Sequence, residues 1–281
     1  MVNTVLTATT RSYHVPEVCG PLSIKAVFSG SAVVTVDNRK LLAQDNSFIV
    51  VNDCQPYAFS IDSFQPTTMF CVFFARGFVE DVWRTTITPH SKLLDNWDVK
   101  GATFAPRYFE RVEVRTASIM PSLHQLRRLI LSDRLTRVRW DETFIRVATD
   151  LVHAEQEVRR RIDRIPAMKS STRREICRRL LRGRDFLLSF ASEPLRLDDV
   201  ARHACLSPYH FHRAFTRFFG KTPHRLLSDY RLERIATQLR HTERTTTELC
   251  LENGFESLPS FSRLFRRRYG MGPREYRRSK S

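Results

Sequence analysis

Residues 207–223 read SPYHFHRAFTRFFGKTP, and residues 257–273 read SLPSFSRLFRRRYGMGP. The two segments are identical at seven of seventeen aligned positions, which indicates an internal duplication. Each copy begins with serine, a favoured N-cap residue, and runs for about three helical turns. Each then reaches a glycine, which accepts the left-handed backbone conformation of a C-cap. The sequence therefore predicts two equivalent helices, fifty residues apart.

Helical spacing separates a packing face from an outward face in each copy. In the first copy the packing face holds Phe211, Ala214, Phe215 and Phe218, and the outward face holds Tyr209, His212, Arg213 and Thr216, with Arg217 at its edge. In the second copy the packing face holds Phe261, Leu264 and Phe265, and the outward face holds Pro259, Ser262, Arg263 and Arg266, with Arg267 at its edge. Arg268 interrupts the second packing face, and we interpret this as fraying of the last turn toward solvent.

A shorter helix is predicted before each copy, at 197–204 and at 247–253, with a turn of two or three residues between. A short helix, a tight turn and a longer helix with a polar face form a helix-turn-helix, whose second helix enters the DNA major groove. The alternative is a pair of amphipathic surface helices whose arginines are only solvated. The repeated context favours DNA.

The charge of the chain is concentrated in the part that holds the repeat. Of the formal net charge of +16, residues 169–281 carry +13, from 25 Lys and Arg against 12 Asp and Glu. This excess predicts a polyanionic partner, and double-stranded DNA is favoured over a membrane because the charges lie on capped helices. The length of 281 residues suits two domains.

The six cysteines contain no C-x-x-C pair, so neither a zinc site nor a disulfide framework is indicated, and a reducing cytoplasm fits best. The first sixteen residues lack the apolar core of a signal peptide. The longest apolar run, residues 69–75, is too short to span a bilayer. We therefore expect a cytoplasmic protein that has no membrane partner.

The N-terminal half is predicted to be a small β-barrel or sandwich. Residues 1–18 are interpreted as a loosely held arm, and short strands follow between residues 22 and 74, including separate strands at 57–61 and 69–74. No histidine occurs between Val15 and Pro89, so the ligands of a metal-bearing cupin enzyme are missing. We predict no metal, no cofactor and no catalytic residue. An interior that encloses an organic ligand and one that is simply a packed core remain equal alternatives.

Helices are predicted at 78–83, 120–132 and 141–162, with a polar connection around Trp97. Along the last helix and beyond it, apolar positions alternate in steps of four and three, with a polar interruption at Glu155. These positions are Phe144, Ala148, Leu151, Glu155, Val158, Ile162 and Ile165. These positions could pack on the chain's own barrel or on a second copy in a homodimer, and the sequence leaves both alternatives open.

Residues 166–171 are predicted to be a linker, because proline and two serines interrupt the helical period. A basic helix at 172–191 and a helix at 223–240 follow. The second of these would be about 28 Å long. A rod of this length suits two recognition helices in successive major grooves, about 34 Å apart. The domains are therefore 1–165, a linker at 166–171 and a DNA-binding domain at 172–281.

Ordered motifs in the C-terminal part resemble the AraC/XylS family of bacterial transcription regulators. They are the runs Leu197–Ala201 and Cys205–Pro208, the pair Phe211 and Phe215 around Arg213, the run Tyr230–Ala236, and the segment from Gly254 to Arg277 with Phe261, Arg263, Phe265, Gly270, Pro273 and Tyr276. In the N-terminal part the likeness to that family's cupin-like domain is architectural. The resemblance implies an α+β chain, in which a small cupin-like β-barrel with trailing helices precedes an all-α domain of two helix-turn-helix units and a linker helix.

The resemblance also implies a sensory and dimerisation role for the barrel, and activation of transcription by contact with RNA polymerase. Its base-reading positions transfer to Tyr209, His212 and Arg213, and to Pro259, Ser260 and Arg263. Pro259 departs from the pattern because a proline ring makes no bidentate hydrogen bonds, and Cys250 stands where the family often has alanine.

Among the outward residues, we expect Arg213 and Arg263 to read bases, because a guanidinium group can bridge guanine O6 and N7. The residues expected to contact phosphates are Thr216, Arg217, Arg266 and Arg267. The hypothesis is a sequence-specific DNA-binding activator with a small-molecule effector in its barrel. The alternatives are a non-specific architectural DNA-binding protein and, with less support, a cupin-type enzyme.

Overall fold

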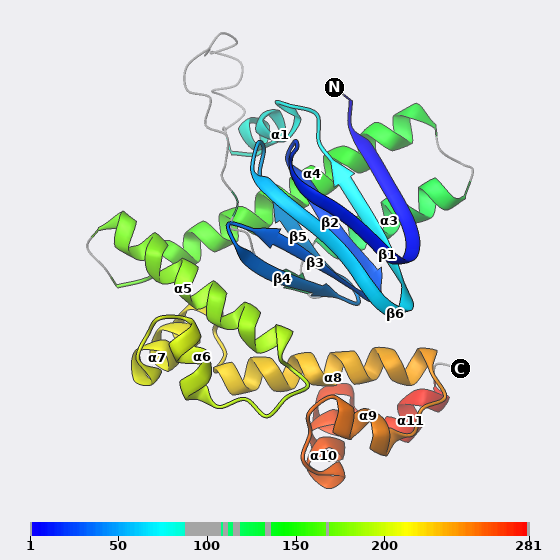
Figure 1. Cartoon of the computed structure of the whole chain (residues 1–281), viewed down its shortest axis with the longest axis vertical. Coiled ribbons are helices and arrows are strands. Elements are labelled where there is room, and N and C mark those ends of the chain that lie inside the picture. The colour runs from blue at the N-terminus through cyan, green and yellow to red at the C-terminus, as the bar shows by residue number, and fades with distance from the viewer. Residues whose placement is uncertain are drawn as a thin grey trace. The chain divides into compact units, whose positions relative to one another are not determined.

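The computed structural model of the chain describes residues 2–87, 108, 112–114, 119–132, 136–166 and 169–279 (Figure 1). Contacts divide the chain into two compact units, Met1–Arg161 and Ile162–Ser281. The connection predicted around Trp97 and two residues of the predicted linker, 167 and 168, lie outside the described residues. Along the parts that are described, no helix is both long enough and apolar enough to cross a bilayer.

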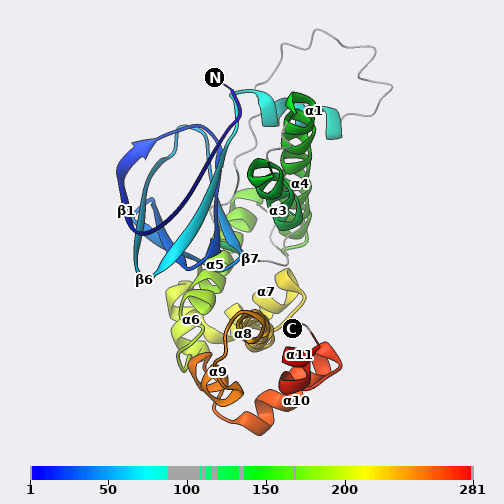
Figure 2. The same cartoon turned by 90° about the vertical axis from the view of Figure 1, so that its right-hand side faces the viewer.

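One curled antiparallel sheet forms the core of the first unit (Figures 1 and 2). Its strands are β1 (Thr4–Cys19), β2 (Ser23–Ser29), β3 (Ser31–Val36), β4 (Arg39–Gln44), β5 (Ser47–Val51), β6 (Pro56–Phe73) and β7 (Val112–Val114). The strand order is β4-β3-β6-β2-β5-β7, and β1 pairs with β6. This half-barrel, followed by helices, confirms the predicted α+β class.

The prediction of a loose N-terminal arm is wrong, because that segment is the strand β1. It pairs with β6 from Thr4 opposite Phe73 to Cys19 opposite Pro56. Most of its side chains are exposed, so the hydrophobic alternation that marks a half-buried strand is weak. The strand is held by its backbone pairing with β6, a long-range contact that no local pattern reveals.

The two strands predicted at 57–61 and 69–74 are one long strand, β6. Its first half pairs with β3, and its second half pairs with β2. The register of β1 jumps from Thr10 opposite Thr67 to Ser12 opposite Asp62, so residues 63–66 are left out of that ladder. Pro66 lies in this interruption and therefore costs the β1–β6 pairing no hydrogen bond.

The sheet is buried on both faces at β2 and β5, where nearly every residue is buried. One face packs against the helices α1 (Phe78–Ile87), α3 (Ile119–Leu131) and α4 (Arg137–Asp163), and the other face lies inside the curl of the sheet. Alternate residues of β2 show the arrangement, because Ile24 contributes to the cluster under the helices and Val27 to the cluster inside the curl. Burial on two faces explains why these strands are apolar along their length.

The first part of the four-and-three repeat packs within the first unit. Phe144, Ala148 and Leu151 belong to the cluster between α4 and the sheet, and each is at most 2% exposed. Glu155 is also buried, and its carboxylate lies 3.2 Å from the Arg159 guanidinium one turn later. Of the two alternatives, packing on the chain's own sheet is the one observed for these three apolar side chains.

The second unit is helical, and α8 connects its two halves (Figure 1). Its helices are α5 (Ser170–Ser189), α6 (Leu197–His203), α7 (Pro208–Phe219), α8 (Pro223–His241), α9 (Thr246–Glu252), α10 (Leu258–Tyr269) and α11 (Pro273–Arg278). The helix α8 contacts α5 and α7 of the first copy and α9 and α11 of the second. At 19 residues it is about 28 Å long, as predicted.

Each half of the second unit has an aromatic core. Phe211 and Phe215 of α7 are fully buried, and so are Phe261 and Phe265 of α10. The α5 helix approaches α7 closely at Gly183, where an added Cβ would lie 2.5 Å from the Phe211 ring. Side chains of α8, α9, α10 and α11 form the second core, and Cys250 packs inside it as a small apolar residue.

Candidate nucleic-acid interface

The helices α7 and α10 begin and end as their sequences predict. The hydroxyl of the N-cap residue, Ser207 or Ser257, accepts a hydrogen bond from the backbone N–H three residues later, at 3.4 Å in both copies. Gly220 and Gly270 are the C-caps, with φ angles of 69° and 76°. The duplicated sequence is thus a duplicated local structure.

We expect Ser207→Ala to destabilise the second unit by about 1 kcal/mol, because it removes the acceptor for an otherwise unpaired N–H at the start of α7. Urea unfolding followed by circular dichroism measures the effect. Ser207→Asp restores an acceptor and serves as the control, since its stability should return to near the wild-type value. Equal losses from both substitutions would contradict the capping role.

The turns before α7 and α10 each contain a residue in the left-handed backbone conformation, and only the second copy has a glycine there. Gly254 has a φ of 76°, and Cys205 occupies the equivalent place with a φ of 54°. Each turn is closed by a backbone hydrogen bond, from Leu206 N to Ala201 O in the first copy and from Phe255 N to Cys250 O in the second. A non-glycine residue in the left-handed region is uncommon, so the pattern did not predict it for Cys205.

The predicted base-reading residues of α7 lie together on its exposed side. Tyr209 is 75% exposed, and His212 and Arg213 are also exposed. Arg217 is exposed one turn further on. Thr216 is half-buried, and its hydroxyl donates to the His212 carbonyl at 2.8 Å, so this side chain is partly committed to its own helix.

The predicted residues of α10 form a second exposed group. Pro259, Ser260 and Arg263 are exposed, and so are Arg266 and Arg267 on the following turn. The structure therefore gathers the candidates into two groups, one on each outward helix. Ser262, which the helical spacing also turns outward, is half-buried.

The outward arginines carry unneutralised charge, in contrast to many other arginines of the second unit. Within the part of the chain that the structure describes, no carboxylate pairs with the arginines of the two groups, which are Arg213, Arg217, Arg263, Arg266 and Arg267. Arg202 of α6, by comparison, lies 3.4 Å from Asp199. Two exposed surfaces with uncompensated guanidinium groups suit a polyanion.

The prediction that Arg268 lies at a frayed helix end is wrong. Its guanidinium pairs with Asp229 at 3.3 Å and also with Glu233, both on α8. Burial raises the pKa of Glu233, and the charge of Arg268 opposes that rise. The residue thus anchors α10 to α8 and helps to orient the outward face, a role visible only in the fold.

Arg231 of α8 makes structural contacts that the sequence did not predict. Its guanidinium donates to the carbonyls of Ala191 at 2.6 Å, Glu193 at 2.9 Å and Gly254 at 2.6 Å. Burial lowers its pKa. The first two carbonyls follow α5 and the third lies in the turn before α10, so one side chain links the two copies. The sequence motif Tyr230–Ala236 includes Arg231, but the sequence does not indicate which carbonyls accept its hydrogen bonds.

The C-terminal part of the chain is similar in sequence to known helix-turn-helix proteins. Residues 200–279 match a family model described as a helix-turn-helix domain. The chain is 34% identical over 85 residues to the HTH-type transcriptional regulator ArgR of Pseudomonas aeruginosa, covering 30% of this chain and 26% of ArgR. It is 36% identical over 91 residues to the HTH-type transcriptional activator RhaS of Escherichia coli, covering 32% of each.

Among solved structures, the C-terminal domain of AraT, a response regulator from Geobacillus stearothermophilus, is 28% identical, covers 36% of this chain and 84% of that chain, and has a TM-score of 0.35. The chain spans about a quarter of the length of ArgR and about a third of the length of RhaS. The residues that match the family model contain α7, α9 and α10 with their caps.

Proposed function

We propose that this chain, whose residues 200–279 form a helix-turn-helix domain of the AraC type, is a sequence-specific DNA-binding regulator of transcription. The observation that carries the proposal is the pair of capped helices, α7 and α10, each with exposed guanidinium groups that no described carboxylate neutralises. The two helices enter successive major grooves of one asymmetric site. The chain carries out no catalytic step.

The exposed residues divide into two roles by their chemistry. Tyr209, His212 and Arg213 read bases from α7, and Pro259, Ser260 and Arg263 face the bases from α10. A guanidinium group can bridge the O6 and N7 atoms of guanine, whereas a proline ring offers only apolar contact. Base discrimination is therefore concentrated on α7. Thr216, Arg217, Arg266 and Arg267 contact phosphates and hold the register without reading sequence.

We expect the affinity of the full chain for duplex DNA to fall steeply with salt. Each phosphate neutralised contributes about 0.9 to the slope of log affinity against log salt, so Arg217, Arg266 and Arg267 alone predict a slope of about −2.7 or steeper. Fluorescence anisotropy titrations between about 50 and 200 mM salt measure the slope. A slope near zero would exclude the proposed interface.

Two matched substitutions test whether the salt dependence arises from the exposed side of α10. Arg267→Gln should reduce the magnitude of the slope by about 0.9. Arg202→Gln removes the same charge from an arginine that is already paired with Asp199 on α6, and should leave the slope unchanged. An equal effect of both substitutions would mean that net charge, and not this face of α10, determines the salt dependence.

Activation of transcription through contact with RNA polymerase is a further part of the proposal. It is supported by the similarity to RhaS, which is described as an activator. A reporter gene behind the bound site, assayed with and without the protein, distinguishes activation from repression. A protein that binds random and promoter duplexes with equal affinity would instead be architectural. The proposed place of action is the cytoplasm.

We assign sensory and dimerisation roles to residues 1–165, DNA binding to 172–281, and a linking role to 166–171. Binding of an organic effector inside the curled sheet is part of this proposal. It is supported by a buried cation, Lys25, which lies inside the curl. Lys25 is 2% exposed, and its Nζ lies 3.8 Å from the centroid of the Phe73 ring and 4.6 Å from that of Tyr57. Burial lowers its pKa to about 8. Ligand pockets are typically apolar with a few placed polar groups.

Two measurements test these roles of the first unit. An effector is found by screening for compounds that raise the unfolding temperature reported by tryptophan fluorescence, since Trp83, Trp97 and Trp140 all precede residue 162. Sedimentation of the full chain determines whether it forms a homodimer. A chain that stays monomeric at high concentration would remove dimerisation from the proposal.

A further inference from the structure

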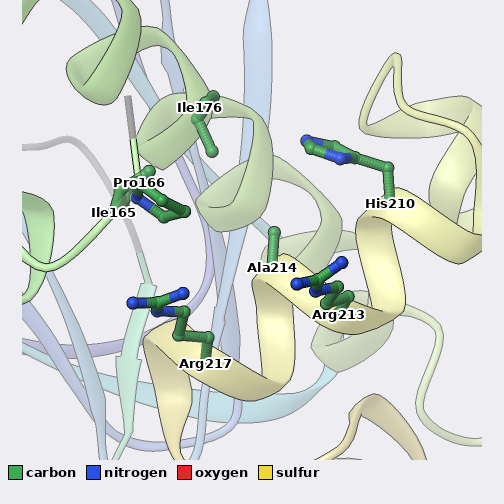
Figure 3. Close-up of a pocket in the computed structure, with 7 residues that line it drawn as sticks. All are labelled: Ile165, Pro166, Ile176, His210, Arg213, Ala214 and Arg217. Carbon is green, nitrogen blue, oxygen red and sulfur yellow. The ribbon is translucent and has the colours of Figure 1, made fainter. Parts of the chain in front are cut away.

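A cavity of about 220 Å³ lies beside α7 within the second unit (Figure 3). Its apolar walls are Ile165 and Pro166, which follow α4, and Ile176 of the facing helix α5. The side chains from α7 that complete it are His210, Arg213, Ala214 and Arg217. Of these, His210 was not predicted as a functional residue, although it shares the i, i+3, i+4, i+7 stripe of the other three.

The internal repeat indicates one origin of this space. Position 214 is alanine, whereas the equivalent position of the second copy is Leu264, which packs against the core there. Alanine has three fewer carbon atoms than leucine. The shorter side chain leaves room along α7 that the second copy fills with its own side chain.

The cavity has an uneven distribution of charge. His210, Arg213 and Arg217 line it from α7, and none of the described lining residues carries a carboxylate. Neither arginine has an ion-pair partner in the described part of the chain. Guanidinium groups form strong charge-assisted hydrogen bonds with carboxylates. An apolar wall that faces two unpaired guanidinium groups is complementary to a small anion with a hydrocarbon body.

We propose that this cavity binds a small monocarboxylate that carries a compact hydrocarbon ring. An apolar cavity of about 150 Å³ accommodates benzene, so the space beside α7 can hold a six-membered ring together with a carboxylate group. The ring lies against Ile165, Ile176 and Ala214. The carboxylate accepts hydrogen bonds from Arg213 and Arg217.

Occupancy of this cavity regulates DNA binding. Arg213 is the proposed base-reading residue, and a carboxylate bound in the cavity holds its guanidinium group toward Ile165 and Ile176 and away from the base edges. The ligand therefore competes with DNA for α7. This consequence rests on the proposed function, whereas the binding of the carboxylate does not.

Isothermal titration calorimetry on the full chain without DNA tests the cavity directly. The probe is cyclohexanecarboxylate, and the comparisons are cyclohexylmethanol, which lacks the charge, and acetate, which lacks the ring. We expect saturable binding of the probe at one site and at least about tenfold weaker binding of each comparison compound. No saturable binding of the probe, or equal binding of the alcohol, would overturn the proposal.

Variants locate the binding to this cavity. Ala214→Leu introduces the residue of the second copy, fills the space and should weaken probe binding by at least about tenfold while α7 remains folded. Arg217→Gln should have an effect of similar size, because it removes a charge-assisted hydrogen bond. Arg267→Gln is its match, since it changes the equivalent arginine of α10 and should leave probe binding unaltered. Equal losses in both arginine variants would show non-specific anion binding and overturn the site.

DNA competition separates this inference from the proposed function. In anisotropy titrations, the probe should lower the apparent DNA affinity of the wild-type chain and not that of Ala214→Leu. If the chain binds no DNA, the proposed function fails, and the calorimetry still decides whether the cavity binds the carboxylate. If the chain binds DNA with the same affinity in saturating probe, the regulatory part of the inference is wrong.

Discussion

Arg231→Met will lower the free energy of unfolding of the second unit by about 2–4 kcal/mol. The substitution keeps an unbranched apolar stem and removes the donors to the carbonyls of Ala191, Glu193 and Gly254. A hydrogen bond to a charged group contributes about 1.5–3 kcal/mol, and a buried acceptor left without a donor adds a desolvation cost. The Ala191 residue is 1% exposed, so its carbonyl has little access to water in exchange.

Urea unfolding of the full chain measures this loss by far-ultraviolet circular dichroism. Tryptophan fluorescence is the internal control, because all three tryptophans lie in the first unit and their transition should not move. The matched variant is Arg234→Met, which removes one exposed hydrogen bond to Ser192 and should cost less than about 1 kcal/mol. If both variants lose the same stability, Arg231 does not link the two copies.

Arg213→Ala will relax base preference in one half of the DNA site and cost about 1–3 kcal/mol of binding free energy. The exposed side of α7 offers an aromatic ring, an imidazole and a guanidinium group, whereas that of α10 offers one guanidinium group, a hydroxyl and a proline ring. Selection of bound sequences from a random duplex pool measures the preference at each position. We expect the preference to be lost at one or two adjacent positions.

Arg266→Ala is the matched control for this experiment, because it removes the same side chain from the outward side of α10. It should weaken all sequences alike and leave the selected motif unchanged, as expected for a phosphate contact. If the motif survives Arg213→Ala at every position, α7 is not the reading helix. If Arg266→Ala changes the motif, α10 reads bases as well.

Local signals predicted the second unit closely. The N-caps at Ser207, Ser257 and Thr222, and the C-caps at Gly220 and Gly270, are where their sequences placed them. Such signals involve residues within one helical turn, so they can be recognised without knowledge of the fold. The apolar spacing likewise predicted which side of α7 is buried, because Phe211, Phe215 and Phe218 all face the core.

Local sequence patterns predicted the first unit less well. The strand β1 is mostly exposed, and it is defined by residues of β6 that lie tens of positions away along the chain. In the same way, the apolar repeat of α4 predicted a packing face without indicating its partner. Only the structure shows that Phe144, Ala148 and Leu151 pack against the chain's own sheet.

By itself, the sequence determined the duplication, the caps of α7 and α10 and most of their exposed residues, since these depend on residue types at short, regular spacing. The tertiary structure alone decided three further features. Arg231 joins the two copies, and Arg268 anchors α10 to α8. Ala214 lines a cavity, whereas the second copy has the larger Leu264 at the equivalent position. Each depends on which groups from distant segments come within contact distance, and long-range packing, not local spacing, determines those distances.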